Sequence, residues 1–304
     1  RPKNRFIYFA VLIGIGFFWT GTAYIVQAYR MLQFLNGDTV NLLVCGAYYV
    51  CQAVGIGAVA IAFAKRPAIA GGRILPFWAT IITVVCVAAT VFSSSLVVII
   101  MTGTLMNVMI GILSGCYLTR LATDIPQQRR GLVFGSAYAF GSVGTWLMSL
   151  PMNGKFLWNS NSLFAIVVLA AISLLLLRHL SPPPKQERSD YLLSPLFSKK
   201  VIWLAAAVLF LLSLQNTLGF SFPLKSASGS VYIEFTRAFY AVGLIIAGLV
   251  SDKNRRWGAA CCLAALAFPF AALALGSSIA GETTMWILAY LFLGDRKSTR
   301  LNSS

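Results

Sequence analysis

Long apolar runs, each about as long as a bilayer is thick, constrain this sequence more than any other feature. A helix needs about 20 predominantly apolar residues to cross the hydrocarbon core of a membrane. Nine such runs lie at about 7–29, 40–64, 74–92, 96–118, 131–151, 161–178, 201–222, 231–250 and 257–277. Hydrophobic residues make up 58% of the chain and charged residues only 11%, too few charges for the surface of a soluble globular protein. We therefore predict an all-α, polytopic membrane protein, and exclude a soluble enzyme and a disordered regulator.

The cations are distributed unevenly between the connections that join these runs. When every second connection is counted from the N-terminus, 17 of the 24 Lys and Arg residues fall in one set. The alternate set holds only Arg30, Lys155 and Lys225. Loops rich in Lys and Arg stay in the cytoplasm. The alternation predicts a multi-pass protein of the plasma (inner) membrane, with its N-terminus and its basic connections on the cytoplasmic side.

The longest internal connection, 181–200, divides the chain. It contains three consecutive prolines and charges of both signs, which is typical of a linker. It predicts a six-helix bundle at 1–180, a cytoplasmic linker at 181–200 and a partial second bundle at 201–294. A tenth apolar run begins near Thr283 and stops after about a dozen residues, short of a full span. The segment 295–304 resembles a translated sequencing adapter, so we expect a non-native tail on a fragment truncated at its C-terminus.

Several classes of function are not expected from the content of the sequence. It has no P-loop, no glycine-rich dinucleotide fingerprint and no nucleophile elbow, so we expect neither ATP-driven pumping nor enzymatic catalysis. His179 is the one histidine, and the six cysteines lie in apolar runs without a paired spacing. We therefore expect no metal site and no cofactor. The cations stand in short clusters between apolar runs rather than on one solvated face, which argues against nucleic-acid binding.

A charged loop follows the eighth apolar run. It reads Gly248-Leu-Val-Ser-Asp252-Lys253-Asn-Arg255-Arg256. The acid stands at a helix end among three cations, where it can pair with a neighbouring helix, and the glycine permits close helix approach. The equivalent loop of the first half, 62–68, keeps the cations but has no acid. A third pattern, ATDIPQQRRG at 122–131, follows the fourth run and precedes a helix rich in small residues.

These three patterns resemble the major facilitator superfamily of membrane transporters. The loop at 248–256 is similar to the G-x-x-x-D-[RK]-x-G-R-[RK] motif of this family, and departs from it where the second glycine would stand. The resemblance covers 1–294 and implies two six-helix halves, with two and a half helices of the second half missing from this sequence. It also implies that Gly248, Asp252, Lys253, Arg255 and Arg256 form a gate on the cytoplasmic side.

In this family the solute cavity is lined largely by the first, fourth, seventh and tenth helices. Polar groups inside membrane helices are costly and therefore informative, and three of them recur on one face of the first run. The resemblance implies a substrate pathway that includes Thr20, Tyr24, Gln27, Asn107, Gln215 and Asn216. The alternative is that the same side chains form hydrogen bonds between helices.

Glu234 and Arg237 stand three residues apart in the eighth run and can pair on one helical face. One interpretation is a proton-coupling carboxylate held by an arginine. The other is that Glu234 is hydrated at the outer interface while Arg237 extends its side chain to that interface. Asp38 and Glu282 are expected in outer loops, so proton coupling through a buried acid depends on Glu234.

We thus expect a secondary transporter in the lipid bilayer, with a monomer favoured, whose partners are a small solute and, if Glu234 is a coupling carboxylate, protons. The alternative is a membrane sensor, in which a similar ligand-binding bundle passes a signal to an output domain beyond this sequence, such as a helix-turn-helix.

The cation asymmetry predicts that the linker at 181–200 faces the cytoplasm. With the native cysteines replaced by alanine, Ser189→Cys should resist a membrane-impermeant thiol reagent added to intact cells. It should react once the membrane is permeabilised. Rapid labelling in intact cells would reverse the predicted orientation.

Overall fold

The fold is helical wherever it is described. The computed structural model describes residues 2–66, 72–149, 160–180, 233–254 and 278–299, with 257, 260, 267, 268, 271, 274 and 275. There is no strand among these residues. The chain divides into two compact units, which we describe separately. Unit 1 is Arg1–Pro126 with Phe140–Lys185, and unit 2 is Gln127–Ala139 with Gln186–Ser304.

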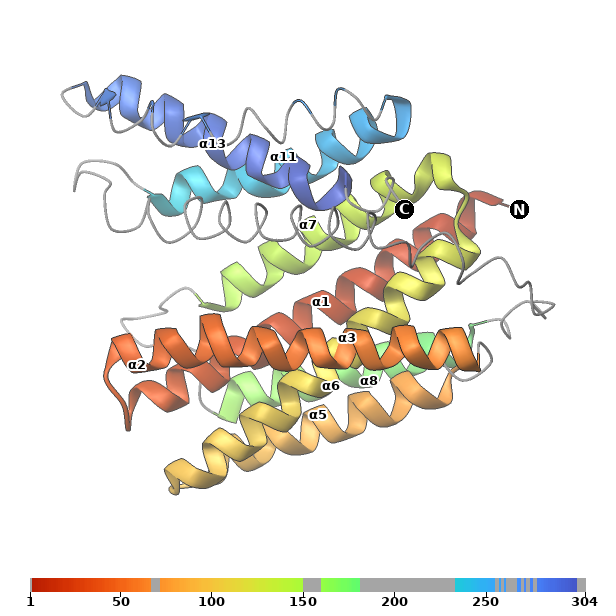
Figure 1. Cartoon of the computed structure of the whole chain (residues 1–304), viewed down its shortest axis with the longest axis vertical. Coiled ribbons are helices and arrows are strands. Elements are labelled where there is room, and N and C mark those ends of the chain that lie inside the picture. The colour runs from red at the N-terminus through yellow and green to blue at the C-terminus, as the bar shows by residue number, and fades with distance from the viewer. Residues whose placement is uncertain are drawn as a thin grey trace, which may run out of the picture. The chain divides into compact units, whose positions relative to one another are not determined.

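Unit 1 holds a helix at each of the first four apolar runs and at the sixth. These are α1 (Pro2–Leu32), α2 (Gly37–Leu42), α3 (Tyr48–Lys65), α5 (Ile74–Phe92), α6 (Leu96–Asp124) and α8 (Ser160–Arg178). The second half of α7 (Arg130–Ser149) completes the unit. A π-helical turn, Leu43–Ala47, joins α2 to α3 without a break. In Figure 1, α6 lies beside α3 and α5, and α8 lies beside α1.

Polar and conformationally restricted residues set several helix ends in unit 1. Asn36 caps α2, since its side-chain oxygen accepts the Thr39 N–H at 2.9 Å. Pro76 stands in the first turn of α5, where its missing N–H breaks no helical hydrogen bond. Ser93–Ser95 separate α5 from α6. The apolar runs therefore end as helices where polar residues satisfy the backbone.

Three helices in the described part of the chain are long and apolar enough to cross a membrane, namely Arg5–Leu32, Ile74–Phe92 and Leu96–Asp124. Their outward side chains are large and apolar, as at Val85 and Phe92, which are 61% and 74% exposed. Apolar surface of this extent suits lipid rather than water. By the length and hydropathy of these helices, the chain is a membrane protein.

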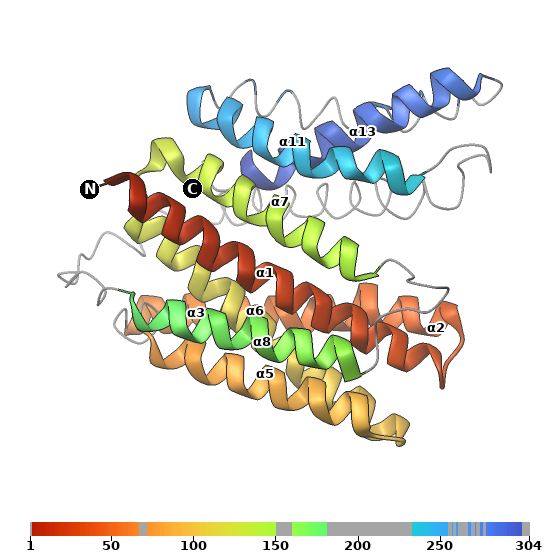
Figure 2. The same cartoon turned by 180° about the vertical axis from the view of Figure 1, so that it is seen from behind.

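Unit 2 contains a 3-10 turn (Gln127–Arg129), the first part of α7, α11 (Ile233–Lys253) and α13 (Ile279–Thr299). The last two pack closely (Figure 2), because a Cβ on Gly243 would collide with the backbone of Leu291. The tenth apolar run is thus part of a helix that reaches Thr299. The predicted linker 181–200, the seventh run and most of the ninth lie outside the described residues.

The contact between α3 and α6 is one of backbone against backbone. A Cβ on Gly111 would collide with the carbonyl of Gln52, and one on Gly55 would lie 2.8 Å from the amide nitrogen of Ile112. Glycine lets membrane helices approach this closely, so that van der Waals packing can hold them together.

We predict that Gly111→Ala forces α3 and α6 apart. Overpacking of this kind costs about 1–3 kcal/mol, so the midpoint of thermal unfolding in detergent should fall. The matched control is Gly57→Ala on α3, because a Cβ at Gly57 meets no atom within 4 Å. That control should keep or slightly raise the midpoint, since alanine is the better helix former. An equal fall of the unfolding midpoint in both variants would contradict the close contact between α3 and α6.

Candidate functional site

Gln27 lies at the centre of a buried polar network in unit 1. Its side chain is 1% exposed. Its amide nitrogen donates to the Ile99 carbonyl at 2.7 Å and to the Tyr48 hydroxyl at 3.3 Å, and its amide oxygen accepts the Thr90 hydroxyl at 2.8 Å. A Cβ on Gly103 would collide with this amide and with the Tyr48 hydroxyl. The network therefore joins α1, α3, α5 and α6, and glycine makes room for it.

Asn107 extends the network one turn further along α6. It is fully buried, its amide donates to the Gly103 carbonyl at 2.8 Å, and its oxygen accepts the Gln52 amide at 2.7 Å. Two predicted pathway residues thus meet at Gly103, where the Gln27 amide lies against its Cα and Asn107 bonds its carbonyl. Both bond within unit 1.

The other two residues of the first-helix stripe also bond within unit 1. The Thr20 hydroxyl donates to the Gly16 carbonyl at 2.7 Å, and the Tyr24 hydroxyl donates to the Val44 carbonyl at 2.6 Å. Interhelical bonding therefore accounts for the contacts described at Tyr24, Gln27 and Asn107. Contact between the stripe and a solute stays a prediction.

Sequence reasoning missed Thr90 and Thr102 as members of this network. Their hydroxyls lie 2.9 Å apart. Threonine is frequent in apolar helices, where its hydroxyl often bonds a carbonyl of its own helix. Thr22, Thr80 and Thr83 do so, and no sequence signal separates them from Thr90.

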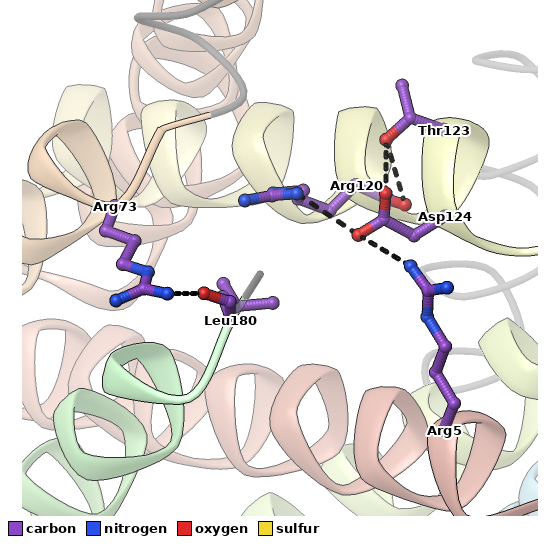
Figure 3. A network of polar contacts seen from close by, with 6 residues as sticks. All are labelled: Arg5, Arg73, Arg120, Thr123, Asp124 and Leu180. Carbon is purple, nitrogen blue, oxygen red and sulfur yellow. Dashed lines mark hydrogen bonds and ion pairs between the residues drawn. The ribbon is translucent and has the colours of Figure 1, made fainter. Parts of the chain in front are cut away.

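A second polar cluster lies at the end of α6 (Figure 3). Asp124 accepts from Arg120 at 3.2 Å and pairs with Arg5 of α1 at 3.8 Å. The side chains of Arg120 and Asp124 are only 5% and 4% exposed. Buried charges are tolerated when they are paired and hydrogen-bonded, and the Thr123 hydroxyl adds a bond to Asp124 at 3.1 Å. The cluster ties α6 to α1.

Arg73 makes a similar tie between two other helices. It precedes α5 and donates to the carbonyl of Leu180, just beyond the end of α8 (Figure 3). A cation at a helix C-terminus satisfies carbonyls that have no helical partner and complements the helix dipole. Arginines thus hold two pairs of helices together in unit 1.

Asp252 of unit 2 caps a neighbouring helix. Its two carboxylate oxygens accept the backbone N–H groups of Gly131 and Leu132, each at 2.9 Å. These N–H groups belong to the first turn of α7, where the backbone has no helical acceptor and the dipole favours a negative charge. Gly248 lies one turn before Asp252, and a Cβ there would be 3.0 Å from the Leu132 Cα. The acid thus reaches a helix end that the glycine brings close.

The remaining predicted site residues are placed only in part. Lys253 ends α11 and is exposed. Glu234 and Arg237 lie in the first two turns of α11, but their side chains are outside the described part. Four predicted residues lie wholly outside it: Gln215, Asn216, Arg255 and Arg256.

The expected position of Glu282 in an outer loop is wrong. Glu282 lies in the first turn of α13 and is 2% exposed. The helix begins four residues before the apolar run, so the run alone placed its start too late. Glu234 is therefore not the one acid to consider for proton coupling in the second half.

No protein-family model matches this sequence, and no protein of curated function is similar to it. The resemblance to the major facilitator superfamily accordingly rests on the sequence patterns and stays a hypothesis.

We predict that Gln27→Ala lowers the stability of the protein. Interhelical hydrogen bonds in membranes contribute about 0.6 kcal/mol each on average, so losing three should cost about 2 kcal/mol. The control is Thr22→Val, because Thr22 is equally buried but bonds the Phe18 carbonyl of its own helix. Thermal unfolding in detergent should separate the two variants. A role in solute contact predicts the reverse for Gln27→Ala, namely unchanged stability and weaker solute binding.

Proposed function

We propose that this chain is a secondary transporter of the major facilitator type, which moves a small solute across the plasma membrane by alternating access. In this proposal the chain crosses the membrane many times, with its N-terminus in the cytoplasm. The cation asymmetry of the connections supports this orientation. The bond between Asp252 and the first turn of α7 is the observation that carries the proposal.

A transporter that alternates between two states needs contacts that hold firmly and release readily. The Asp252 contact has these properties. It joins α7, which belongs to the first half of the sequence, to α11, which belongs to the second. Hydrogen bonds to charged groups contribute about 1.5–3 kcal/mol each. Because Asp252 is half-buried, water can replace its partners when the contact opens.

The backbones of α7 and α11 lie close together next to Asp252. A Cβ on Gly135 of α7 would collide with the Leu244 carbonyl of α11, and a Cβ on Gly248 would collide with the backbone of Gly131. The rings of Tyr138 and Tyr240 pack edge to face across the same contact. Glycine thus brings the Asp252 carboxylate within reach of the first turn of α7.

The solute site and the coupling ion follow from the same proposal. The candidate solute contacts of this proposal are the six predicted pathway residues, namely Thr20, Tyr24, Gln27, Asn107, Gln215 and Asn216. Glu234 with Arg237 stays a candidate for proton coupling. Glu282 is a further candidate, because it is 2% exposed and an acid buried in a membrane protein is usually functional.

We predict that Asp252→Asn weakens the closed state on the cytoplasmic side. The variant loses the negative charge and one of the two acceptor oxygens, and a loss of about 1.4 kcal/mol is a tenfold change in an equilibrium. The reporter is Ser251→Cys, since Ser251 is 2% exposed, in a protein without native cysteines. Its labelling rate in inside-out vesicles should rise about tenfold.

The matched control is Leu249→Ala, because Leu249 is 44% exposed in the same turn of α11 and its replacement leaves the cap and the other gate residues intact. Unchanged labelling in Asp252→Asn would refute the gate.

Reconstituted vesicles distinguish a transporter from a sensor. Flux of a solute that the protein binds supports transport, whereas binding without flux supports the sensor.

A further inference from the structure

The second membrane helix contains a turn that departs from α-helical geometry. In an α-helix the Tyr48 N–H would donate to the Val44 carbonyl, four residues back. It donates instead to the Leu43 carbonyl, five residues back, in the π turn Leu43–Ala47. The Val44 carbonyl accepts the Tyr24 hydroxyl of α1 at 2.6 Å. The tyrosine thus bonds the carbonyl that the Tyr48 N–H would use in an α-helix.

We propose that Leu43–Ala47 is a two-state hinge and that Tyr24 is the positioning residue that holds it in the π form. A backbone carbonyl in an apolar helix needs a donor from the protein. In the π form Tyr24 supplies it. In the alternative form the Tyr48 N–H returns to Val44, the turn becomes α-helical, and the Tyr24 hydroxyl is released.

We call the α3 side of the hinge its inner side and the α2 side its outer side. The inner side is held in place by its contacts. Gln52 bonds Asn107 at 2.7 Å, and Gly55 lies against the backbone of α6. Tyr48 is 1% exposed, and its hydroxyl reaches the sulfur of Met31 at 3.5 Å and accepts from Gln27. A change in the turn therefore moves the other side, the short helix Gly37–Leu42.

The outer side has room to move. A Cβ on Gly46 or on Gly37 meets no atom within 4 Å, and Leu42 is 73% exposed. A π turn holds one residue more than an α turn. Its conversion to an α turn therefore rotates Gly37–Leu42 about the helix axis by about 100°, the angle of one residue. In the π form Val40 and Val44 both pack in a buried cluster with Tyr48 and Met31. This packing and the Tyr24 bond together oppose the intrinsic preference for α-helix.

The hinge separates the outer end of the second helix from the rigid α3–α6 pair. In the transport cycle it would let that end move while the bundle stays intact. This consequence rests on the proposed function, but the hinge itself does not. Its test therefore uses the full chain without any solute.

The first experiment measures the distance between two spin labels across the hinge. The labels sit on Gly37→Cys and Gly57→Cys, because a Cβ at either glycine meets no atom within 4 Å, and the native cysteines are replaced by alanine. Tyr24→Phe should shift the distance distribution by roughly 3–8 Å or add a second population. The control is Tyr8→Phe on α1, the helix that also carries Tyr24, because it removes a hydroxyl bonded to the Leu176 carbonyl of α8. An unchanged distribution in Tyr24→Phe, or the same shift in Tyr8→Phe, overturns the hinge.

The second experiment deletes one residue. Without Gly46, Leu43 becomes the fourth residue before Tyr48, so the existing N–H bond becomes an α-helical one. This deletion should preserve folding, measured by thermal unfolding, and should abolish the effect of Tyr24→Phe on the distance. Deletion of Gly57, an equally open glycine within α3, should abolish folding because it rotates one side of a regular helix.

Equal damage from the two deletions overturns the hinge, as does a shift that survives deletion of Gly46. If Tyr24→Phe does not fold on its own, deletion of Gly46 should restore folding, and failure to restore it also overturns the hinge.

Discussion

Polar groups inside an apolar helix bundle have no water to bond, and this constraint explains the hydrogen bonds that link the helices of unit 1. Gln27, Asn107 and Thr90 are each at most 1% exposed, and each has a partner on another helix. The same rule applies to charge. Arg120 and Asp124 are buried together, since a lone charge in that position would cost several kcal/mol. These polar contacts therefore link α1, α3, α5 and α6 of unit 1.

Glycine and polar bonding act together at these contacts. Gly103 leaves the space that the Gln27 amide fills on its way to the Ile99 carbonyl, and Gly248 lies one turn from the Asp252 carboxylate. A polar side chain reaches a backbone group on another helix only when the two backbones are close. Glycine without a polar partner would give packing alone, and a polar side chain without glycine would be kept at a distance. A glycine together with a polar side chain therefore fixes both the distance and the orientation of the two helices at each contact.

Most helices in the described part of unit 1 were predictable from sequence, but their partners were not. The apolar run 74–92 coincides with α5, because Pro76 and Ser93 mark its two ends. The spacing of Thr20, Tyr24 and Gln27 predicted one face of a helix, and all three lie on α1. That Gln27 meets Thr90, 63 residues away, depends on the rotation of each helix about its axis, which a uniformly apolar helix does not reveal. The π turn was hidden for a similar reason, since its residues are as apolar as those of a regular helix.

The polar contacts of the two units differ in whether water could replace the lost partners if the helices separated. Separation of α1 from α5 and α6 would leave the Gln27 amide, which is 1% exposed, without its partners Thr90 and Ile99 in a site closed to solvent. Separation of Asp252 from α7 would expose a half-buried carboxylate and two N–H groups at a helix end, all of which water can bond. The first contact is thus suited to a bundle that stays rigid, and the second to a contact that breaks and re-forms. Alternating access by moving bundles requires both kinds, because a contact can work as a gate only when the bundles on each side of it move as whole bodies.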